Sequence, residues 1–342
     1  MANLGEYVTI RRRPVSRRWI KYFIGVGVTL ICLFVFIRQV NFIDVMEAFT
    51  SFHWEYLMLG VASLAFGYAL RIFRWSIMLK ATGATTSFAN CSAPFLVSIA
   101  LNNILPLRLG DVVRALVFPT SMGITKTTAT SSLIVERLID LMSLLACFAI
   151  GLYAIQTIEI PSELKTSVVT LALIGSVTLS VGFLFSEALD DLFSGIAAKP
   201  GVHSDVGRIY NTLGNLLHGF NVMSRPKVLL AMLIVSTLVW VGEAGLFYFV
   251  LLGVGVEGSP VIALLVMAVA TLSTLIPSSP GYVGSFHLAA FTAVSLVGGT
   301  AAQAGTYAVI VHLALWLPTT LAGALAIWVC PEIFRAAKSQ AA

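Results

Sequence analysis

LNNILPLRLGDVVR, at residues 101–114, interrupts an apolar helix with a proline and a glycine, and LSTLIPSSPGYVGSFH, at residues 272–287, repeats that interruption later in the chain. Pro106 recurs 171 positions on as Pro277, each with a glycine four residues after it, and 171 is half of the 342-residue length. Paired breaks at matching places in two halves of a membrane chain point to the binding site of a transporter. We therefore expect the two breaks to lie at corresponding places in two related halves of the protein.

Composition assigns the chain to the integral membrane proteins. It is 58% hydrophobic and 11% charged, with a mean hydropathy of +0.93, whereas soluble domains carry roughly 25% charged residues. The net charge of +5 is explained better by membrane edges than by nucleic acid, because basic residues cluster there in membrane proteins. The four cysteines have no metal-type spacing, so we expect no metal and no cofactor.

Six apolar runs are long enough to cross about 30 Å of hydrocarbon, and we expect each to be a full transmembrane helix. They lie at about 19–38, 55–73, 128–155, 166–186, 228–252 and 303–329. The broken regions, about 88–118 and 260–298, are expected to be re-entrant hairpins, because a loop at membrane depth must be buried in protein or line a wet cavity.

The distribution of charge gives the expected orientation. With a cytoplasmic N-terminus and only the six full helices crossing, most lysines and arginines fall in cytoplasmic loops, Arg71 and Arg74 among them. Three full spans then separate the hairpins, so they enter from opposite faces. We expect an all-α polytopic protein with an inverted-topology repeat, in the bacterial cytoplasmic (inner) membrane with both termini cytoplasmic.

The whole chain is expected to form one transmembrane domain. Its expected parts are a basic cytoplasmic N-terminus at 1–18, a first repeat at 19–155, a second repeat at 166–329 and a cytoplasmic tail at 330–342. Within the second repeat, 187–227 is polar with apolar residues at helical spacing. An amphipathic helix on the cytoplasmic face and a helix packed under the bundle both fit this pattern.

The first break carries Arg108, Asp111 and Arg114. Asp111 and Arg114 are three apart and share a face if a half-helix starts near Gly110. Two guanidinium groups beside a helix start suit a phosphate, because arginine donates in a fork. The alternative is that both arginines are anchors at the cytoplasmic edge.

The third span carries Glu136, Arg137 and Asp140 in its interior. An ionisable group inside a span costs a few kcal/mol on insertion scales, so such groups are candidates for function. Two interpretations stay open. One is a proton or substrate relay; the other is a structural pair of Arg137 with Asp140 or with a neighbouring helix. Glu243 and His312 are lone ionisable groups in later spans, for which a structural role is favoured over coupling.

The second break offers Ser278 and Ser279, followed by backbone N–H groups of a half-helix starting near Gly284. Together they could hold an anionic headgroup from the outer side. His287, one turn into that half-helix, could couple a proton; a plain helix-breaking loop is the alternative. The expected hinge and turn residues are Pro106, Gly110, Pro277, Pro280, Gly281 and Gly284.

Motifs of known enzymes are missing from the sequence. There is no P-loop, no HExxH, no nucleophile elbow and no dinucleotide fingerprint. We therefore expect a protein that is not an enzyme and not an ATP-driven pump on its own.

Three motifs in one order carry a family resemblance: PLRLGDVVR from Pro106, ERLID from Glu136 and PSSPGYVGSFH from Pro277. The combination resembles the flippase-like family that includes the transmembrane region of lysylphosphatidylglycerol synthases, over about residues 20 to 330. Asp111 stands where that family usually has Glu, Tyr282 replaces a glycine, and His287 stands where Glu is common.

The resemblance implies a flippase or secondary transporter of an anionic or phosphate-bearing amphiphilic lipid, such as a phospholipid, a polyprenyl-phosphate or a hopanoid-type lipid. The alternative is a non-catalytic membrane subunit that presents lipid to a glycosyl- or acyltransferase. A chain ending at Ala342 leaves no room for the aminoacyl-transfer domain of the bifunctional synthases, so we expect no lipid lysinylation. Expected partners are a membrane lipid and, in the alternative, that transferase, but no nucleic acid.

Overall fold

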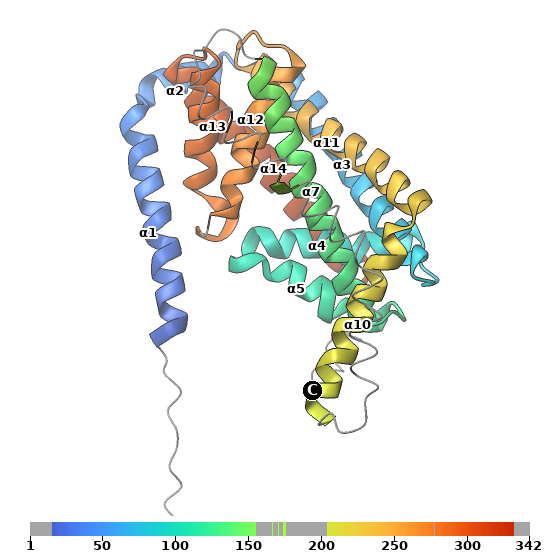
Figure 1. The fold of residues 1–342 in the computed structure, drawn as a ribbon. Coiled ribbons are helices and arrows are strands. Elements are labelled where there is room, and N and C mark those ends of the chain that lie inside the picture. The colour runs from blue at the N-terminus through green and yellow to red at the C-terminus, as the bar shows by residue number, and fades with distance from the viewer. Residues whose placement is uncertain are drawn as a thin grey trace, which may run out of the picture.

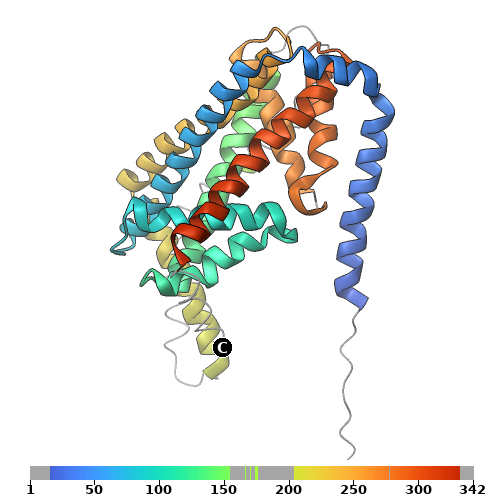
Figure 2. The ribbon, with the colours of Figure 1, turned by 180° about the vertical axis from the view of Figure 1, so that it is seen from behind.

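The computed structural model describes residues 16–154, 204–276 and 278–331, with isolated positions at 166, 170, 174 and 175. Within these residues every regular element is a helix (Figures 1 and 2). The α-helices are α1 (Ser16–Gln39), α2 (Phe42–Thr50), α3 (Trp54–Ala81), α4 (Phe88–Ile104), α5 (Leu109–Leu116), α6 (Phe118–Ser121), α7 (Lys126–Ala154), α10 (Ser204–Ser224), α11 (Pro226–Gly253), α12 (Pro260–Leu272), α13 (Ser285–Leu296) and α14 (Ala301–Val329). Short 3-10 helices are η1 (Pro106–Arg108), η2 (Ser273–Leu275) and η3 (Pro280–Tyr282).

Three of these helices, α3, α11 and α14, are apolar and 28 or 29 residues long, enough to cross a membrane. A fourth span exists if α1 and α2, bent by 79°, count as one. The helix predicted at 128–155 is α7. It is not one of these three apolar helices, because ionisable residues lie at its centre. The span predicted at 166–186 lies almost wholly outside the described residues, as do 1–15, 187–203 and 332–342, so six spans stay a prediction.

The bend after α1 was not predicted. Asn41 caps α2 by accepting a 3.0 Å hydrogen bond from the backbone N–H of Ile43. A side-chain cap satisfies a donor that the start of a helix leaves free. The polar stretch expected to end the first span therefore begins a second, short helix.

Small residues let α3 and α11 approach closely. A Cβ on Gly242 would lie 2.9 Å from the Cα of Gly67, and Ser63 donates to the Gly242 carbonyl at 2.8 Å. Small residues at helix contacts bring backbones within van der Waals range, as is usual in membranes. These two helices and α12, α13 and α14 enclose the largest apolar core, which includes Leu64, Phe247 and Tyr307.

The first broken segment folds back on itself, α5 running beside α4 (Figure 1). Gly110 makes this possible, because a Cβ there would lie 1.9 Å from the Ser98 carbonyl oxygen. Leu107 and Arg108, at the turn, have left-handed backbones with φ of 60° and 53°. The half-helix predicted near Gly110 begins one residue earlier.

The second broken segment also folds back, with α12 beside α13 (Figure 2). The half-helix predicted near Gly284 begins at Ser285. Gly281 and Gly284 have φ of 72° and 91°, and Tyr282 has a left-handed φ of 58°. Pro277, predicted as a turn residue, lies outside the described residues.

The polar segment predicted at 187–227 contains α10. This helix packs against α7: a Cβ on Gly219 would clash with Ser131, and Met223 is fully buried in a cluster with Val135 and Met232. The described part of the segment is therefore a helix seated against the bundle.

Candidate functional site

The two broken segments meet at their turns. Arg108 of η1 donates a 2.9 Å hydrogen bond to the Thr274 hydroxyl of η2, and its guanidinium lies 5.6 Å from the Tyr282 ring centroid of η3. A cavity of about 280 Å³ lies between the turns, lined by residues of both. Stretches 171 positions apart in sequence thus come together at one point.

A larger cavity, about 500 Å³, adjoins the same point. It is lined by side chains of α3, α4, α7 and α11, and Arg108, Thr274 and Tyr282 line both cavities. The protein therefore holds an internal space that reaches from the turns into the helix bundle.

Ionisable side chains on three helices come in pairs around this space. On α3 they are Arg71 and Arg74; on α5, Asp111 and Arg114; on α7, Glu136 and Asp140. Members of each pair are three or four residues apart, which sets them on one helix face. All six side chains are buried, and Arg71, Glu136 and Asp140 line the larger cavity.

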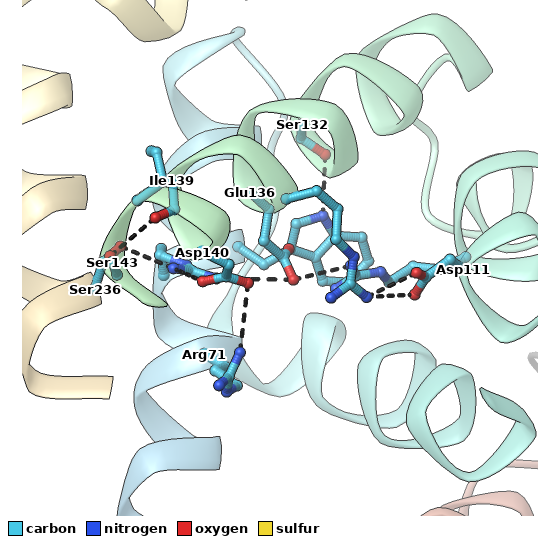
Figure 3. Close-up of polar contacts among 12 residues, drawn as sticks. Arg71, Asp111, Ser132, Glu136, Ile139, Asp140, Ser143 and Ser236 are labelled. Carbon is cyan, nitrogen blue, oxygen red and sulfur yellow. Dashed lines mark hydrogen bonds and ion pairs between the residues drawn. The ribbon is translucent and has the colours of Figure 1, made fainter. Parts of the chain in front are cut away.

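The α3 arginines bind carboxylates of α7 and α11, and Figure 3 shows the part of this arrangement around Asp140. Arg74 donates to Asp140 at 2.7 Å and to the Ser236 hydroxyl at 2.8 Å. Arg71 bridges Asp140 at 3.5 Å and Glu243 at 2.5 Å. Asp140 is therefore held by two guanidinium groups.

Residues of α5 bind the other two ionisable side chains of α7, Glu136 and Arg137. Arg114 donates to Glu136 at 3.0 Å, and a single nitrogen of Arg137 lies 2.8 and 2.7 Å from the two Asp111 oxygens. Asn102 of α4 donates to Asp111 at 2.9 Å and accepts from its backbone N–H at 3.1 Å. These bonds fix the returning half-helix to α4 and α7.

Aromatic faces cover two of the arginines. The Arg114 guanidinium lies 4.6 Å from the Phe95 ring centroid and 5.2 Å from that of Trp75. Arg71 lies 4.9 Å from the Trp240 ring centroid. A planar guanidinium stacks well on such faces, which favours arginine over lysine at these positions.

The network is balanced in charge. Four arginines pair with four carboxylates: Arg71, Arg74, Arg114 and Arg137 with Asp111, Glu136, Asp140 and Glu243. Arg108 stands apart, since no carboxylate in the described part of the chain lies within 4 Å of its nitrogens. The turns therefore carry one positive charge that no described acid neutralises, and it borders both cavities.

The structure corrects two interpretations from sequence and decides between two alternatives for a third residue. Arg114 is 1% exposed, so it is not a membrane-edge anchor, and it does not share the turn with Arg108. Of the two predicted partners of Arg137, Asp140 and a neighbouring helix, the structure has the neighbouring helix, because Arg137 pairs with Asp111 of α5. Glu243 is not a lone group, because it binds Arg71.

The serines of the second turn have partners inside the protein. The Ser279 backbone N–H donates to the Thr29 hydroxyl of α1 at 2.9 Å, and Ser285 donates to the Ser278 hydroxyl at 3.2 Å. Ser278 and Ser279 lie beside α1 and line the 280 Å³ cavity together with Arg108. His287 lies farther along α13, where its ring nitrogens are 3.2 Å from Nδ1 of His312.

Sequence reasoning missed Arg71 and Arg74, which it placed at the cytoplasmic edge. Their helix runs on to Ala81, and Arg74 has no exposed side-chain surface. The available signal was the sequence WSIML at 75–79, an apolar continuation beyond both charges. Asn102, Thr274 and Tyr282 were also missed.

The residues that the structure describes contain no cluster of three or more His, Cys, Asp or Glu side chains placed to hold a metal ion. The site is instead an ion-pair network beside a cavity.

This is a helical membrane protein with two back-folded segments whose turns meet beside a buried charge network. The chain belongs to the family described as the lysylphosphatidylglycerol synthase TM region, whose model matches residues 22–323. The match includes both turns and every member of the network, and it confirms the resemblance seen in the motifs. No curated protein matches the chain.

Proposed function

We propose that this protein is a flippase or secondary transporter that moves an anionic or phosphate-bearing amphiphilic lipid across a bilayer. Candidate lipids are a phospholipid, a polyprenyl-phosphate or a hopanoid-type lipid. The observation that carries the proposal is the position of Arg108, at the meeting point of the two turns and on the border of both cavities.

Arg108 is the group best suited to a phosphate. Its guanidinium is charged and donates in a fork that matches phosphate oxygens. In the structure, Thr274 gives Arg108 a neutral hydrogen-bond acceptor, and the aromatic ring of Tyr282 lies beside its guanidinium. An anionic oxygen is a stronger acceptor than a hydroxyl, so a headgroup entering either cavity would compete for Arg108.

The buried pairs supply a polar route for the headgroup while apolar chains stay among the helices. Arg137 has 33% of its side chain exposed, so its pair with Asp111 is the most accessible in the network. A headgroup bound there would replace Asp111 as the partner of Arg137, and the released carboxylate would keep the hydrogen bond from Asn102.

In this proposal the two turns are alternating gates of an inverted-topology repeat. Opposed hairpins that meet near the midplane, with a half-helix at each turn, are the arrangement expected of such transporters. The repeat spacing of 171 residues and the contact between the turns support it. The proposed location is the bacterial cytoplasmic membrane with both termini cytoplasmic, from the distribution of basic residues.

Lipid movement in vesicles tests the proposal. Purified protein in phosphatidylglycerol-containing vesicles with a fluorescent phosphatidylglycerol in both leaflets should make the inner-leaflet probe accessible to a membrane-impermeant quencher. Arg108→Ala and Asp140→Asn should each slow this movement at least tenfold per folded molecule. A wild-type protein that moves no lipid, or variants that move it equally fast, would overturn the proposal.

A charge-matched control is Lys80→Gln, at the exposed end of α3, which should keep wild-type rates. Wild-type protein that binds the probe and moves none of it would favour the presenting subunit instead. A transferase that co-purifies with the protein would strengthen that alternative.

A further inference from the structure

Two histidines meet in the second half of the molecule, away from the arginine–carboxylate network. Nδ1 of His312 on α14 lies 3.2 Å from both ring nitrogens of His287 on α13, and the ring centroids are 4.4 Å apart. Only five histidines occur in the chain, and no contact between these two was predicted from the sequence. Their contact is therefore information that the fold adds.

The surroundings of the pair are aromatic. Phe36 lies edge-on to His287 with ring centroids 5.8 Å apart, and Phe286 lies 5.2 Å from His312. Two neutral imidazoles can share one N–H···N hydrogen bond, and one added proton keeps that bond as a charge-assisted one. A second proton would set two positive charges about 3 Å apart with little water, so the pair suits one proton and excludes two.

A small cavity connects the pair to the network. It measures about 130 Å³ and is lined by His312, Glu243 and Tyr282, among others. Glu243 is the carboxylate that binds Arg71. A positive charge on the histidine pair would compete with Arg71 for Glu243 across this cavity, and Tyr282 connects the same space to Arg108.

Few other ionisable groups face the pair. Glu243 of α11, Tyr68 of α3 and Tyr282 of η3 line the shared cavity. Neither α12 nor η2, which pack against α13, carries an ionisable side chain. The described side chains of α1, α2 and α4 add Cys32, Arg38, Asp44, Glu47 and Cys91, of which Arg38, Asp44 and Glu47 are exposed, and α14 adds the buried Tyr307. On α3 and α11, which also pack against α14, the others are Glu55, Tyr56, Arg71, Arg74, Lys80, Lys227 and Tyr248.

We infer that His287 and His312 form a site for a single proton, and that this proton is the coupling ion of the transport cycle. The coupling rests on the proposed function, whereas proton binding by the pair does not. The proton comes from water reaching the cavity, bonds to one imidazole nitrogen and leaves by the same atom, so no other reactant is needed.

Nitrogen NMR of ¹⁵N-histidine-labelled protein in detergent tests the binding directly. Across a pH series, the two imidazoles should take up one proton between them. In His312→Gln, the titration midpoint of His287 should move by about one pH unit, as expected for interacting groups. Two full protons on the pair, none at all, or a His287 titration unchanged in His312→Gln would overturn the inference.

Vesicles with an imposed pH difference test the coupling. The gradient should change the rate of fluorescent phosphatidylglycerol movement several-fold in wild type and in His53→Gln, and leave it unchanged in His287→Gln and His312→Gln. A gradient response retained by those two variants contradicts the coupling. If wild type moves no lipid, the proposed function fails with the coupling, and the NMR titration still decides whether the pair holds a proton.

Should a glutamine variant fail to fold, the asparagine variant at that position replaces it, and the wild-type proton count stands by itself. Thermal unfolding of each variant identifies misfolding before either measurement.

Discussion

Arg74 donates to Asp140 at 2.7 Å from a side chain with no exposed surface, although 66 residues separate them in sequence. Arg71 reaches the same carboxylate from one turn earlier on α3. The two ion pairs join α3 to α7. Among the described residues, Ser236 of α11 supplies the only further hydrogen bond to Arg74. Removing the carboxylate would leave the buried Arg74 guanidinium with one neutral hydrogen-bond partner, Ser236, and with Glu136 as a more distant carboxylate at 3.8 Å.

Asp140→Ala should therefore destabilise the protein strongly. Breaking a buried ion pair from one side costs about 3–5 kcal/mol, because the remaining charge is uncompensated. Denaturant unfolding of the purified variant in detergent measures the change. Glu47→Gln, at an exposed site on α2 without an ion pair in the described chain, is the control and should stay within about 0.5 kcal/mol of wild type. A loss below 1 kcal/mol for Asp140→Ala would show that the pair is not truly buried.

Gly110→Ala should prevent the return of α5 along α4. Its new Cβ would lie 1.9 Å from a carbonyl oxygen of Ser98, a backbone atom that cannot turn aside. Overpacking of this kind costs about 1–3 kcal/mol and more where backbone must move. Thermal unfolding should show the loss.

Gly27→Ala is the matched control for that substitution. It lies within α1 with open space around its Cβ position, so alanine should be neutral or stabilise by up to about 1 kcal/mol. Equal unfolding midpoints for the two variants would mean that α4 and α5 do not pack as described.

The places of the two breaks could be predicted because the signal is local. Pro106, and later Pro280 to Gly284, act on their own backbone, and α5 and α13 begin within one residue of the predicted starts. Gly110 acts instead by lacking a Cβ where α5 meets Ser98. Proline removes a donor and glycine permits left-handed conformations whatever the distant contacts are.

The partners in the network could not be predicted in the same way. Arg71 and Glu243 are 172 positions apart, and Arg137 and Asp111 are 26 apart. Helical spacing fixes which residues share a face, but not which helix that face meets. The edge assignment of Arg74 failed because hydropathy ends a span at its first charges, whereas paired charges let the helix continue.

Leu107→Gly should stabilise the first turn. Leu107 has a left-handed φ of 60° and is 65% exposed, so glycine removes strain while little packing is lost. A left-handed conformation costs an L-residue about 1–2 kcal/mol. The thermal midpoint should rise, or stay level if the extra chain entropy of glycine in the unfolded state offsets the gain.

The control is Leu116→Gly, at an exposed position at the end of α5. It relieves no such strain and should lower the midpoint. The reverse order of the two midpoints would contradict the left-handed turn.

The pair of Asp111 and Arg137 should show measurable coupling energy. One Arg137 nitrogen lies within 2.8 Å of both Asp111 oxygens, and groups in such contact are coupled by about 0.5–3 kcal/mol. A double-mutant cycle of Asp111→Asn, Arg137→Gln and the double variant, followed by denaturant unfolding, gives that energy. Asparagine keeps an acceptor for Asn102, so the cycle reports chiefly the ion pair.

The control is a second cycle of Asp111→Asn with Arg225→Gln, because Arg225 is exposed and makes no ion pair with Asp111. That second cycle should be additive within about 0.5 kcal/mol, and equal energies in the two cycles would refute a specific bond between α5 and α7.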